Sequence, residues 1–256
     1  TIAKIQNSGQ VNTLSLSNNT IDSGGAGDIS GIFDNVTLDD ITSTTGIVSG
    51  VGSINFGNDN QLSLKVNNAT VRNMHGVASM FVPGIGTIAY FAAGAGQDAQ
   101  GQTVGNMVLT NSIISDGGTC KTLDISALTG SPGTSLNTIS SQGGNISDEA
   151  GCATYLTQST DQNNVSGFGS TLESLANNGG YVPTIALKQG SPAVDSGVGV
   201  AGLSTDARLA ARPQGSAFDS GAYESAFTKP AKATLASTGE NIKLFTVAAL
   251  LLMSPM

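Results

Sequence analysis

The sequence predicts an all-β chain in which short strands stack as a solenoid. A phrase of alternating apolar residues that ends in Asn recurs along the first half of the chain, and Gly-rich intervals separate its copies. Alternation with a period of two is typical of a strand with one buried face. Because one copy cannot bury that face alone, neighbouring copies are expected to stack along an axis.

Three clear copies of the phrase and one degenerate copy are present. The clear copies are Leu14-x-Leu16-x-Asn18-x-x-Ile21, Leu64-x-Val66-x-Asn68-x-x-Val71 and Met107-x-Leu109-x-Asn111-x-x-Ile114, and the degenerate copy is Val36-x-Leu38-x-Asp40. Their spacing predicts a repeat of roughly 20 to 25 residues. Asn18, Asn68 and Asn111 are expected to occupy turns and to stack as a ladder, because Asn tolerates the left-handed backbone conformation.

The composition excludes several classes of protein. Only 11% of the 256 residues are charged and 5% are aromatic, which excludes disorder driven by charge and disfavours a helical bundle. The net charge is −8, and no cluster of Lys and Arg is present to neutralise phosphates. Nucleic acid is therefore not an expected partner.

The two cysteines, Cys120 and Cys152, have no His or Cys neighbour at the spacing of metal ligands. They form either a disulfide or two buried thiols, and we favour the disulfide, which indicates an oxidising compartment outside the cytoplasm. Calcium loops, phosphate-binding loops and zinc-spaced ligand sets are missing from the sequence, so no metal and no cofactor is expected.

Two further segments carry structural expectations. Residues 80–93 are apolar but interrupted by Pro83, Gly84 and Gly86, so an extra coil or a loop is favoured over a membrane span. Residues 172–176 are expected to form a short helical turn that opens a terminal module. Such a module would cover the exposed strand edges at the end of a strand solenoid.

The last third of the chain carries the most specific motifs. They are Asn178-Gly179-Gly180, Thr184-Ile185-Ala186-Leu187, Gly190-Ser191-Pro192-Ala193-Val194-Asp195, Thr205-Asp206, Arg208, Arg212-Pro213 and Gly221-Ala222-Tyr223-Glu224. In this order they resemble the closing segment of the choice-of-anchor Q domain, a family of bacterial surface proteins. The chain departs from the family pattern at three positions, where Ile185 replaces a His, Leu209 a Gly and Phe218 a Cys.

The resemblance implies a right-handed parallel β-helix with a C-terminal capping module and a flexible tail. We accordingly divide the chain into β-helix coils in residues 1–167, a choice-of-anchor Q-type cap in residues 168–225 and a tail in residues 226–256. Within the cap, the charged residues and one tyrosine are expected to lock the structure rather than to bind polysaccharide or calcium. They are Asp195, Asp206, Arg208, Arg212, Asp219, Tyr223 and Glu224.

The tail contains Leu235-Ala236-Ser237-Thr238-Gly239 followed by an apolar run over residues 244–253. This arrangement resembles a sortase sorting signal of the Leu-Ala-x-Thr-Gly type. The resemblance implies that a sortase thiolate attacks the carbonyl of Thr238 and that a cell-wall amine resolves the acyl-enzyme. The alternative is an ordinary tail with an apolar end, and the run is shorter than the roughly 20 residues of a spanning helix.

Other residues give little sign of catalysis. His75 is the only histidine and has no partner placed by a motif, so a surface or turn position is favoured over a catalytic base. For Asp39 and Asp40, a corner role is favoured over a pair of catalytic carboxylates.

Together these features predict a secreted, non-enzymatic protein anchored to the bacterial cell wall, acting as an adhesin, a recognition surface or a structural stalk. Its expected partners are sortase and peptidoglycan, with polysaccharide or a host or neighbouring cell surface as further possibilities. The alternative is a polysaccharide lyase or glycoside hydrolase, since β-helices often carry these activities. A hydrolase requires two carboxylates facing each other across a groove, and the sequence offers no convincing pair.

Overall fold

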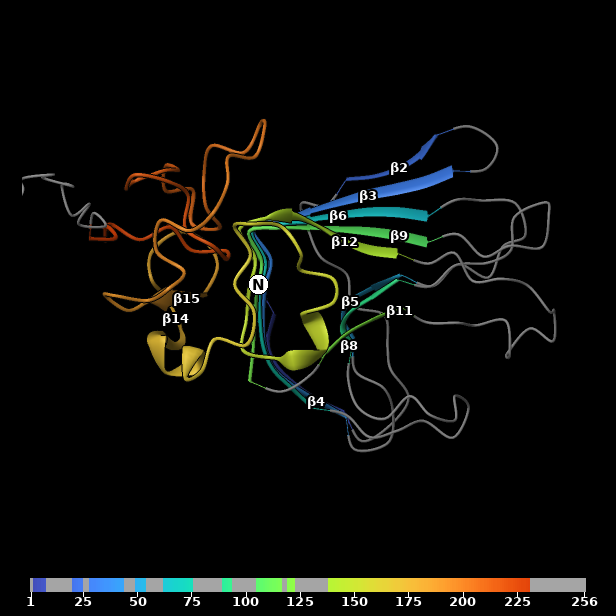
Figure 1. Ribbon diagram of the computed structural model, residues 1–256, viewed down its shortest axis with the longest axis horizontal. Helices are drawn as coiled ribbons and strands as arrows, with labels where there is room; N and C mark the ends of the chain where they lie inside the picture. The colour runs from blue at the N-terminus through green and yellow to red at the C-terminus, as the bar shows by residue number, and fades with distance from the viewer. Residues whose placement is uncertain are drawn as a thin grey trace, which may run out of the picture.

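The computed structural model describes residues 2–7, 20–24, 28–43, 49–53, 62–75, 89–93, 105–116, 119–122 and 138–230. The described residues form β-strands, two short 3-10 turns and irregular segments, so this part of the protein is all-β. Three of its sheets are built mainly from parallel strands (Figure 1).

The first sheet contains five parallel strands in the order β1-β4-β7-β10-β13. Their bounds are β1 Ile2–Asn7, β4 Thr37–Ser43, β7 Thr70–His75, β10 Ile113–Ser115 and β13 Ile146–Ser147. Neighbours in this sheet are never consecutive in the chain, so each strand pairs with one from the following circuit of the backbone.

The second and third sheets complete each circuit. The second has the order β12-β9-β6-β3-β2 and the third β11-β8-β5. The strands of the second are β2 Thr20–Gly24, β3 Asp28–Asp34, β6 Leu62–Asn67, β9 Gly105–Thr110 and β12 Thr138–Gly143. The strands of the third are β5 Ser49–Ser53, β8 Ala89–Ala93 and β11 Thr119–Thr122. We call one visit to the second, first and third sheets a pass.

The strand register corrects the predicted repeat length. Thr70 pairs with Thr37 in the preceding pass and with Ile113 in the following one, and Ile113 pairs with Ile146. Successive passes are therefore offset by 33, 43 and 33 residues in the first sheet. The prediction of 20 to 25 residues was too short, because one pass contains strands of three sheets and the apolar phrase marks only one part of it.

The register also corrects two copies of the phrase. Val66 pairs with Phe33, so the degenerate copy starts at Gly31 and ends at Asn35, not at Asp40. In the earliest copy, Ile21 lies in β2, which runs antiparallel to β3. The position expected for Ile21, beside Leu38, is taken by Ile2 in β1.

Asn residues stand at the corner between the second and first sheets. Asn35, Asn68 and Asn111 adopt positive φ angles of 55°, 53° and 50°, and Gly144 takes the same place in the next pass with a φ of 72°. The left-handed conformation is one that Asn tolerates better than most residues. Asn18, the other expected member of the ladder, lies outside the described residues.

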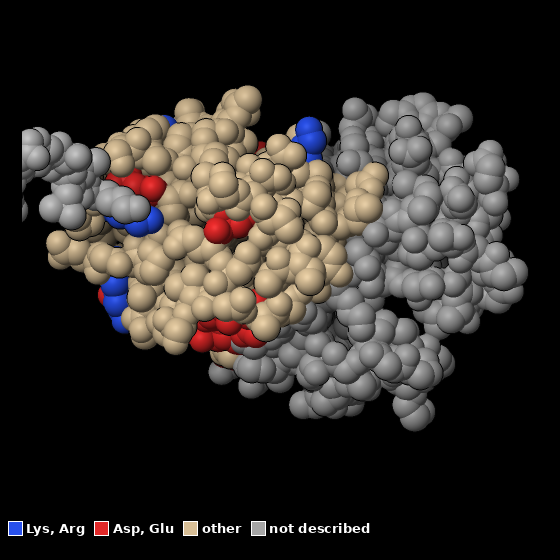
Figure 2. Space-filling model, viewed as in Figure 1, with Lys and Arg blue, Asp and Glu red and all other residues tan. Residues whose placement is uncertain are grey.

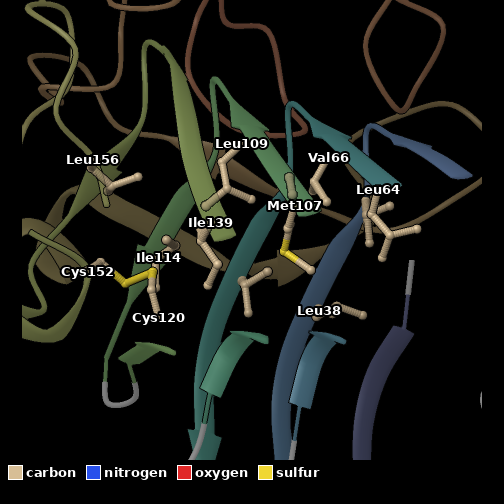
Figure 3. Close-up of a cluster of buried hydrophobic side chains, with 13 residues drawn as sticks. Leu38, Leu64, Val66, Met107, Leu109, Ile114, Cys120, Ile139, Cys152 and Leu156 are labelled. Atoms are coloured by element: carbon tan, nitrogen blue, oxygen red, sulfur yellow. A yellow bond between two sulfur atoms is a disulfide. The ribbon is translucent and has the colours of Figure 1, made fainter. Parts of the chain in front are cut away.

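A disulfide joins the strands to the segment that follows the last pass. Cys120 in β11 is bonded to Cys152 in the 3-10 turn η1 (Ala150–Cys152), which resolves the choice between a disulfide and free thiols. Cys120, Cys152 and Leu156 belong to the same buried cluster as Leu64, Val66, Met107 and Leu109 (Figure 3). Residues 148–167 therefore cover the apolar core beyond the last strands.

The C-terminal part begins with η2 (Phe168–Thr171) and a two-stranded antiparallel sheet, β14 (Leu172–Ala176) with β15 (Thr184–Leu187). The predicted helical turn at residues 172–176 is thus wrong. Buried Leu172 pairs with buried Leu187, so pairing with β15 overrides the weak local preference of five residues. Of residues 80–93, only β8 is described. No helix among the described residues has the length and apolarity to cross a membrane.

Candidate functional site

The C-terminal segment lies along the corner of the strand stack. Nδ2 of Asn35 donates to the carbonyl oxygen of Thr205 at 3.0 Å, and the Ala222 N–H donates to Oγ1 of Thr70 at 2.9 Å. The Ser220 hydroxyl donates to the carbonyl oxygen of Gly144. The segment therefore contacts several successive passes from the side (Figure 1), whereas the end of the core is covered by residues 148–167.

Asn111 provides the most specific of these contacts. Its Oδ1 accepts from the Val198 N–H and its Nδ2 donates to the Val198 carbonyl oxygen, both at 2.7 Å. Gly197 is required beside it, because a Cβ there would lie 2.9 Å from the carbonyl oxygen of Phe218 and 3.1 Å from Cγ of Asn111. In contrast, both side-chain polar atoms of buried Asn68 have no hydrogen-bond partner among the described residues.

Asp206 organises one half of a buried charged network. Its Oδ1 accepts from the N–H groups of Arg208 and Ala210, and its Oδ2 accepts from Nε of Arg208 and the N–H of Glu224. The Arg208 guanidinium lies over the ring of Tyr223, 3.6 Å from its centroid. The charge-assisted hydrogen bonds between Asp206 and Arg208 are stronger than hydrogen bonds between neutral groups.

Arg212 and Glu224 form the other half. Nη1 of Arg212 lies 2.8 Å from Oε2 of Glu224, and both side chains are fully buried. Arg212 also donates to the carbonyl oxygens of Asp219 and Gly221, while Glu224 accepts from the N–H groups of Gln214 and Asp219. Burial lowers the pKa of Arg212 despite Glu224, and it raises the pKa values of Asp219 and Glu224.

Asp195 connects this network to Lys229, near the end of the described C-terminal segment. It accepts from the N–H groups of Ala217 and Lys229, at 2.9 and 2.7 Å, and its own N–H donates to Oδ1 of Asp219. Burial favours the neutral acid, but the N–H groups of Ala217 and Lys229 outweigh that effect and lower the pKa of Asp195. The seven residues expected to act together are thus all in or beside one network.

The network holds the backbone in place through hydrogen bonds, as secondary structure does. Its side chains are not accessible in the way that the side chains of an active site are. Its carboxylates are occupied by backbone N–H groups and arginines, and those of Asp206, Asp219 and Glu224 belong to residues only 1% exposed. Among the described residues, no group of three or more His, Cys, Asp or Glu could hold a metal ion. The arrangement can hold the backbone in place, but it offers no open face to a substrate.

An open groove lies between the first sheet and β14. Its volume is about 680 Å³, and it is lined by Asp39, Asp40, Arg72, Asn73, Asp116, Ser174 and Leu175. Asp40, Asn73 and Asp116 adopt positive φ angles of 53°, 54° and 59°, five residues after the corner Asn of each pass. Asp40 and Asn73 lie inside β4 and β7, and Asp116 directly follows β10. The structural equivalents of Asp40 are therefore Asn73 and Asp116 instead of Asn68.

Arg72 is the basic residue among those that line the groove. Its Nε and Nη2 donate to the two carboxylate oxygens of Asp39, each at 2.9 Å, and its Nη1 donates to the carbonyl oxygen of Glu173 in β14. Burial and the charge of Asp148 raise the pKa of Asp116, with Arg72 opposing them. Asp39 is thus held in an ion pair, and Asp116 is a lining carboxyl whose pKa the site raises.

The groove was missed by sequence reasoning, although a signal was present. Each corner Asn is followed five residues later by Asp or Asn, as in Asn35 and Asp40 or Asn68 and Asn73. Figure 2 shows acidic atoms gathered along the lower edge of the described surface. The side chain of His75 and the whole of Leu235–Gly239 lie outside the described residues.

Comparison with known proteins gave no matching family model, no matching curated protein and no matching solved structure.

Proposed function

We propose that the chain is a right-handed parallel β-helix of the bacterial cell surface, with a C-terminal module of the choice-of-anchor Q type. Passes that visit three sheets in a constant order, with parallel neighbours one pass apart, support this fold. The convergence of the motif residues of the C-terminal segment, which are spread over about 30 positions, on one buried network supports the module.

The disulfide supports an extracellular location. Disulfides persist in oxidising compartments and are rare in the cytosol. The Cys120–Cys152 bond closes a loop between the last complete pass and the end cover, where it stabilises the fold against unfolding outside the cell.

The role proposed for the protein is non-enzymatic, as a recognition surface, adhesin or stalk. The observation that carries this proposal is that the charged network of the C-terminal segment is used for internal bonding. The side chains of Arg212 and Glu224 are fully buried, and both carboxylate oxygens of Asp206 accept hydrogen bonds from the chain itself. Residues 235–239 would serve as the sortase signal, with peptidoglycan as the acceptor.

Cell fractionation tests the anchoring half of the proposal. Replacing Thr238 by Ala in the full-length protein should move it from the wall fraction to the membrane or the medium, because the sortase acyl-enzyme forms at this carbonyl. Thr234→Ala, four residues upstream, is the matched control and should leave wall attachment unchanged. Equal wall attachment of Thr238→Ala and wild type would end the anchoring proposal.

A polysaccharide hydrolase or lyase is the second candidate, and the groove is the observation that favours it. Asp116 has a raised pKa in a site that also contains Asp39 and Asp40. The full chain should be incubated with plant, bacterial and host polysaccharides, and released sugar ends compared with a boiled sample. Release that disappears in Asp116→Asn would replace the non-enzymatic proposal, whereas binding without release would support a recognition surface.

A further inference from the structure

Two large apolar side chains project from neighbouring loops of the C-terminal segment. Tyr181 is 89% exposed and Leu209 is 63% exposed, far more than the other two exposed large apolar residues of the described chain, Ile32 and Phe227. Exposed apolar side chains are common singly on proteins, so their exposure has to be considered together with the placement of the two loops.

The two loops meet directly beside these side chains. A Cβ added to Gly180 would lie 2.6 Å from Cα of Arg208, so the two backbones approach each other closely at these residues. Tyr181 follows Gly180, and Leu209 follows Arg208. Nη1 of Arg208 donates to the carbonyl oxygen of Asn178, and its Nη2 donates to that of Glu224. The buried ionic network therefore holds both loops in place before any ligand arrives, which reduces the entropic cost of binding.

Leu209 occupies a backbone conformation that disfavours it. Its φ is 70°, inside a tight loop in which the Asp206 N–H donates to the carbonyl oxygen of Ala210. Bulky residues rarely adopt the left-handed region, where glycine is unstrained. Leu209 thus costs stability while it exposes apolar surface, and strain of this kind accumulates where function requires a particular side chain.

The surroundings of this pair are uncharged at the surface. Residues 176–187 contain no charged residue. In residues 197–217 the charged side chains are Asp206, Arg208 and Arg212, which are paired within the network. With a net charge of −8 for the chain and no free cation beside the pair in the described loops, an anionic ligand is disfavoured.

We propose that Tyr181 and Leu209 form a binding surface for an uncharged glycan. A sugar ring presents an apolar C–H face that a tyrosine ring can cover, while the phenol hydroxyl remains available for hydrogen bonds. A protein partner is less favoured, because a stable protein interface requires about 800 Å² from each partner, and the pair stands in no wider apolar patch among the described residues. The inference rests on the proposed recognition role and names its ligand class.

Glycan binding by matched variants of the full chain tests this inference. The probes are dextran, mannan and amylose as neutral glycans, with polygalacturonate as the anionic one, and binding is measured by biolayer interferometry. Tyr181→Ala should weaken binding of a neutral glycan at least tenfold. Leu209→Gly should weaken it several-fold while leaving the melting temperature unchanged or higher, because glycine relieves the strained conformation. Ile32→Ala, at an exposed apolar site elsewhere, should leave glycan binding unchanged.

The outcomes separate this inference from the proposed function. A neutral glycan that still binds Tyr181→Ala normally, but is lost in Arg72→Ala in the groove, would overturn the inference and leave the recognition role standing. A lower melting temperature in Leu209→Gly would show that Leu209 is structural and would also overturn it, as would binding of polygalacturonate alone or of no glycan. Wall attachment through Thr238 is measured independently of all of these results.

Discussion

The stacked strands and the C-terminal segment satisfy the same backbone requirement in different ways. In the stack, the N–H and C=O groups of each strand are bonded by strands of adjacent passes, as between β6 and β9. From residue 188 to residue 230 there is no named strand, and side-chain carboxylates accept from the N–H groups of Ala217, Glu224 and Ser225. In this segment, carboxylates therefore supply part of the backbone bonding that neighbouring strands supply in the sheets.

The difference predicts different sensitivities. The stack has many equivalent backbone bonds, so losing one side chain leaves the register intact. The C-terminal segment depends on a few side chains, each of which holds several backbone groups. Single substitutions should therefore affect the segment more than the stack.

Removing Glu224 should have the largest effect. Glu224→Ala leaves Arg212 as a buried, uncompensated charge and releases the N–H groups of Gln214 and Asp219. Breaking a buried ion pair costs about 3 to 5 kcal/mol, so the C-terminal segment should detach before the stack unfolds. Urea unfolding and limited proteolysis would measure this. Glu173→Ala, at an exposed position of β14, is the control, and equal stability of the two variants would contradict the argument.

Removing the disulfide should have the next largest effect, and it should act on the stack. The bond closes a loop with a sequence separation of 32 residues. Loss of a disulfide that closes a loop of this size costs about 3 to 4 kcal/mol through the entropy of the unfolded chain. Cys120→Ala/Cys152→Ala should open the end cover at residues 148–167 to protease first. Cleavage that begins in residues 188–230 would be the opposite of what we expect.

The corner asparagines allow a comparison between equivalent positions of successive passes. Their side chains do not bond one another as a ladder, because Asn35 and Asn111 bond the C-terminal segment and Asn68 has no partner among the described residues. Asn111→Gly keeps the left-handed backbone but removes both bonds to Val198, and it should cost about 1 to 3 kcal/mol. Asn68→Gly removes a buried amide that has no partner among the described residues, so it should cost clearly less. Thermal unfolding of both variants measures the difference, and a larger loss for Asn68→Gly would reverse the assignment of roles.

Titration of Asp219 and Asp195 should give the smallest effect and should have opposite signs. Burial raises the pKa of Asp219 above 3.8, so its contribution to stability is complete below that pH and is lost as pH rises through its folded pKa. The pKa of Asp195 is lowered from 3.8, so its contribution is present above that pH and is lost as pH falls through its folded pKa.

Urea unfolding across the acidic range would separate the two. Asp219→Asn should flatten the fall in stability as pH rises toward neutrality, whereas Asp195→Asn should flatten the fall as pH drops. If both variants reduce the pH dependence of the unfolding free energy over the same part of the pH range, the opposite titration of the two carboxyls is refuted.

Much of the stack could be predicted from the sequence because alternation and corner Asn residues are local signals. The strands of the third sheet carried no such signal: Ser49–Ser53 and Thr119–Thr122 contain mainly small or polar residues, and the two aromatic residues of Ala89–Ala93 are adjacent instead of alternating. The length of a pass was therefore underestimated. The register of the degenerate copy was missed because Gly31, which pairs with Leu64, has no side chain to mark it.

The candidate sites divide in the same way. The charged residues of the C-terminal segment could be chosen from the motifs they belong to, and the structure brings them together. Their partners on the strands could not be found, since Asn35 and Thr205 are 170 residues apart and share no local pattern. The groove required the register of three passes, which brings Asp40, Asn73 and Asp116 into equivalent positions.

Hydrogen exchange at individual backbone N–H groups tests the central claim most directly. We predict that the N–H groups of Asp219, Glu224 and Ser225, which are bonded to carboxylates, exchange as slowly as those of β9, and that Glu224→Ala accelerates them without affecting β9. Fast exchange of these three groups in the wild type, with β9 still protected, would show that the carboxylates do not replace secondary structure in the C-terminal segment.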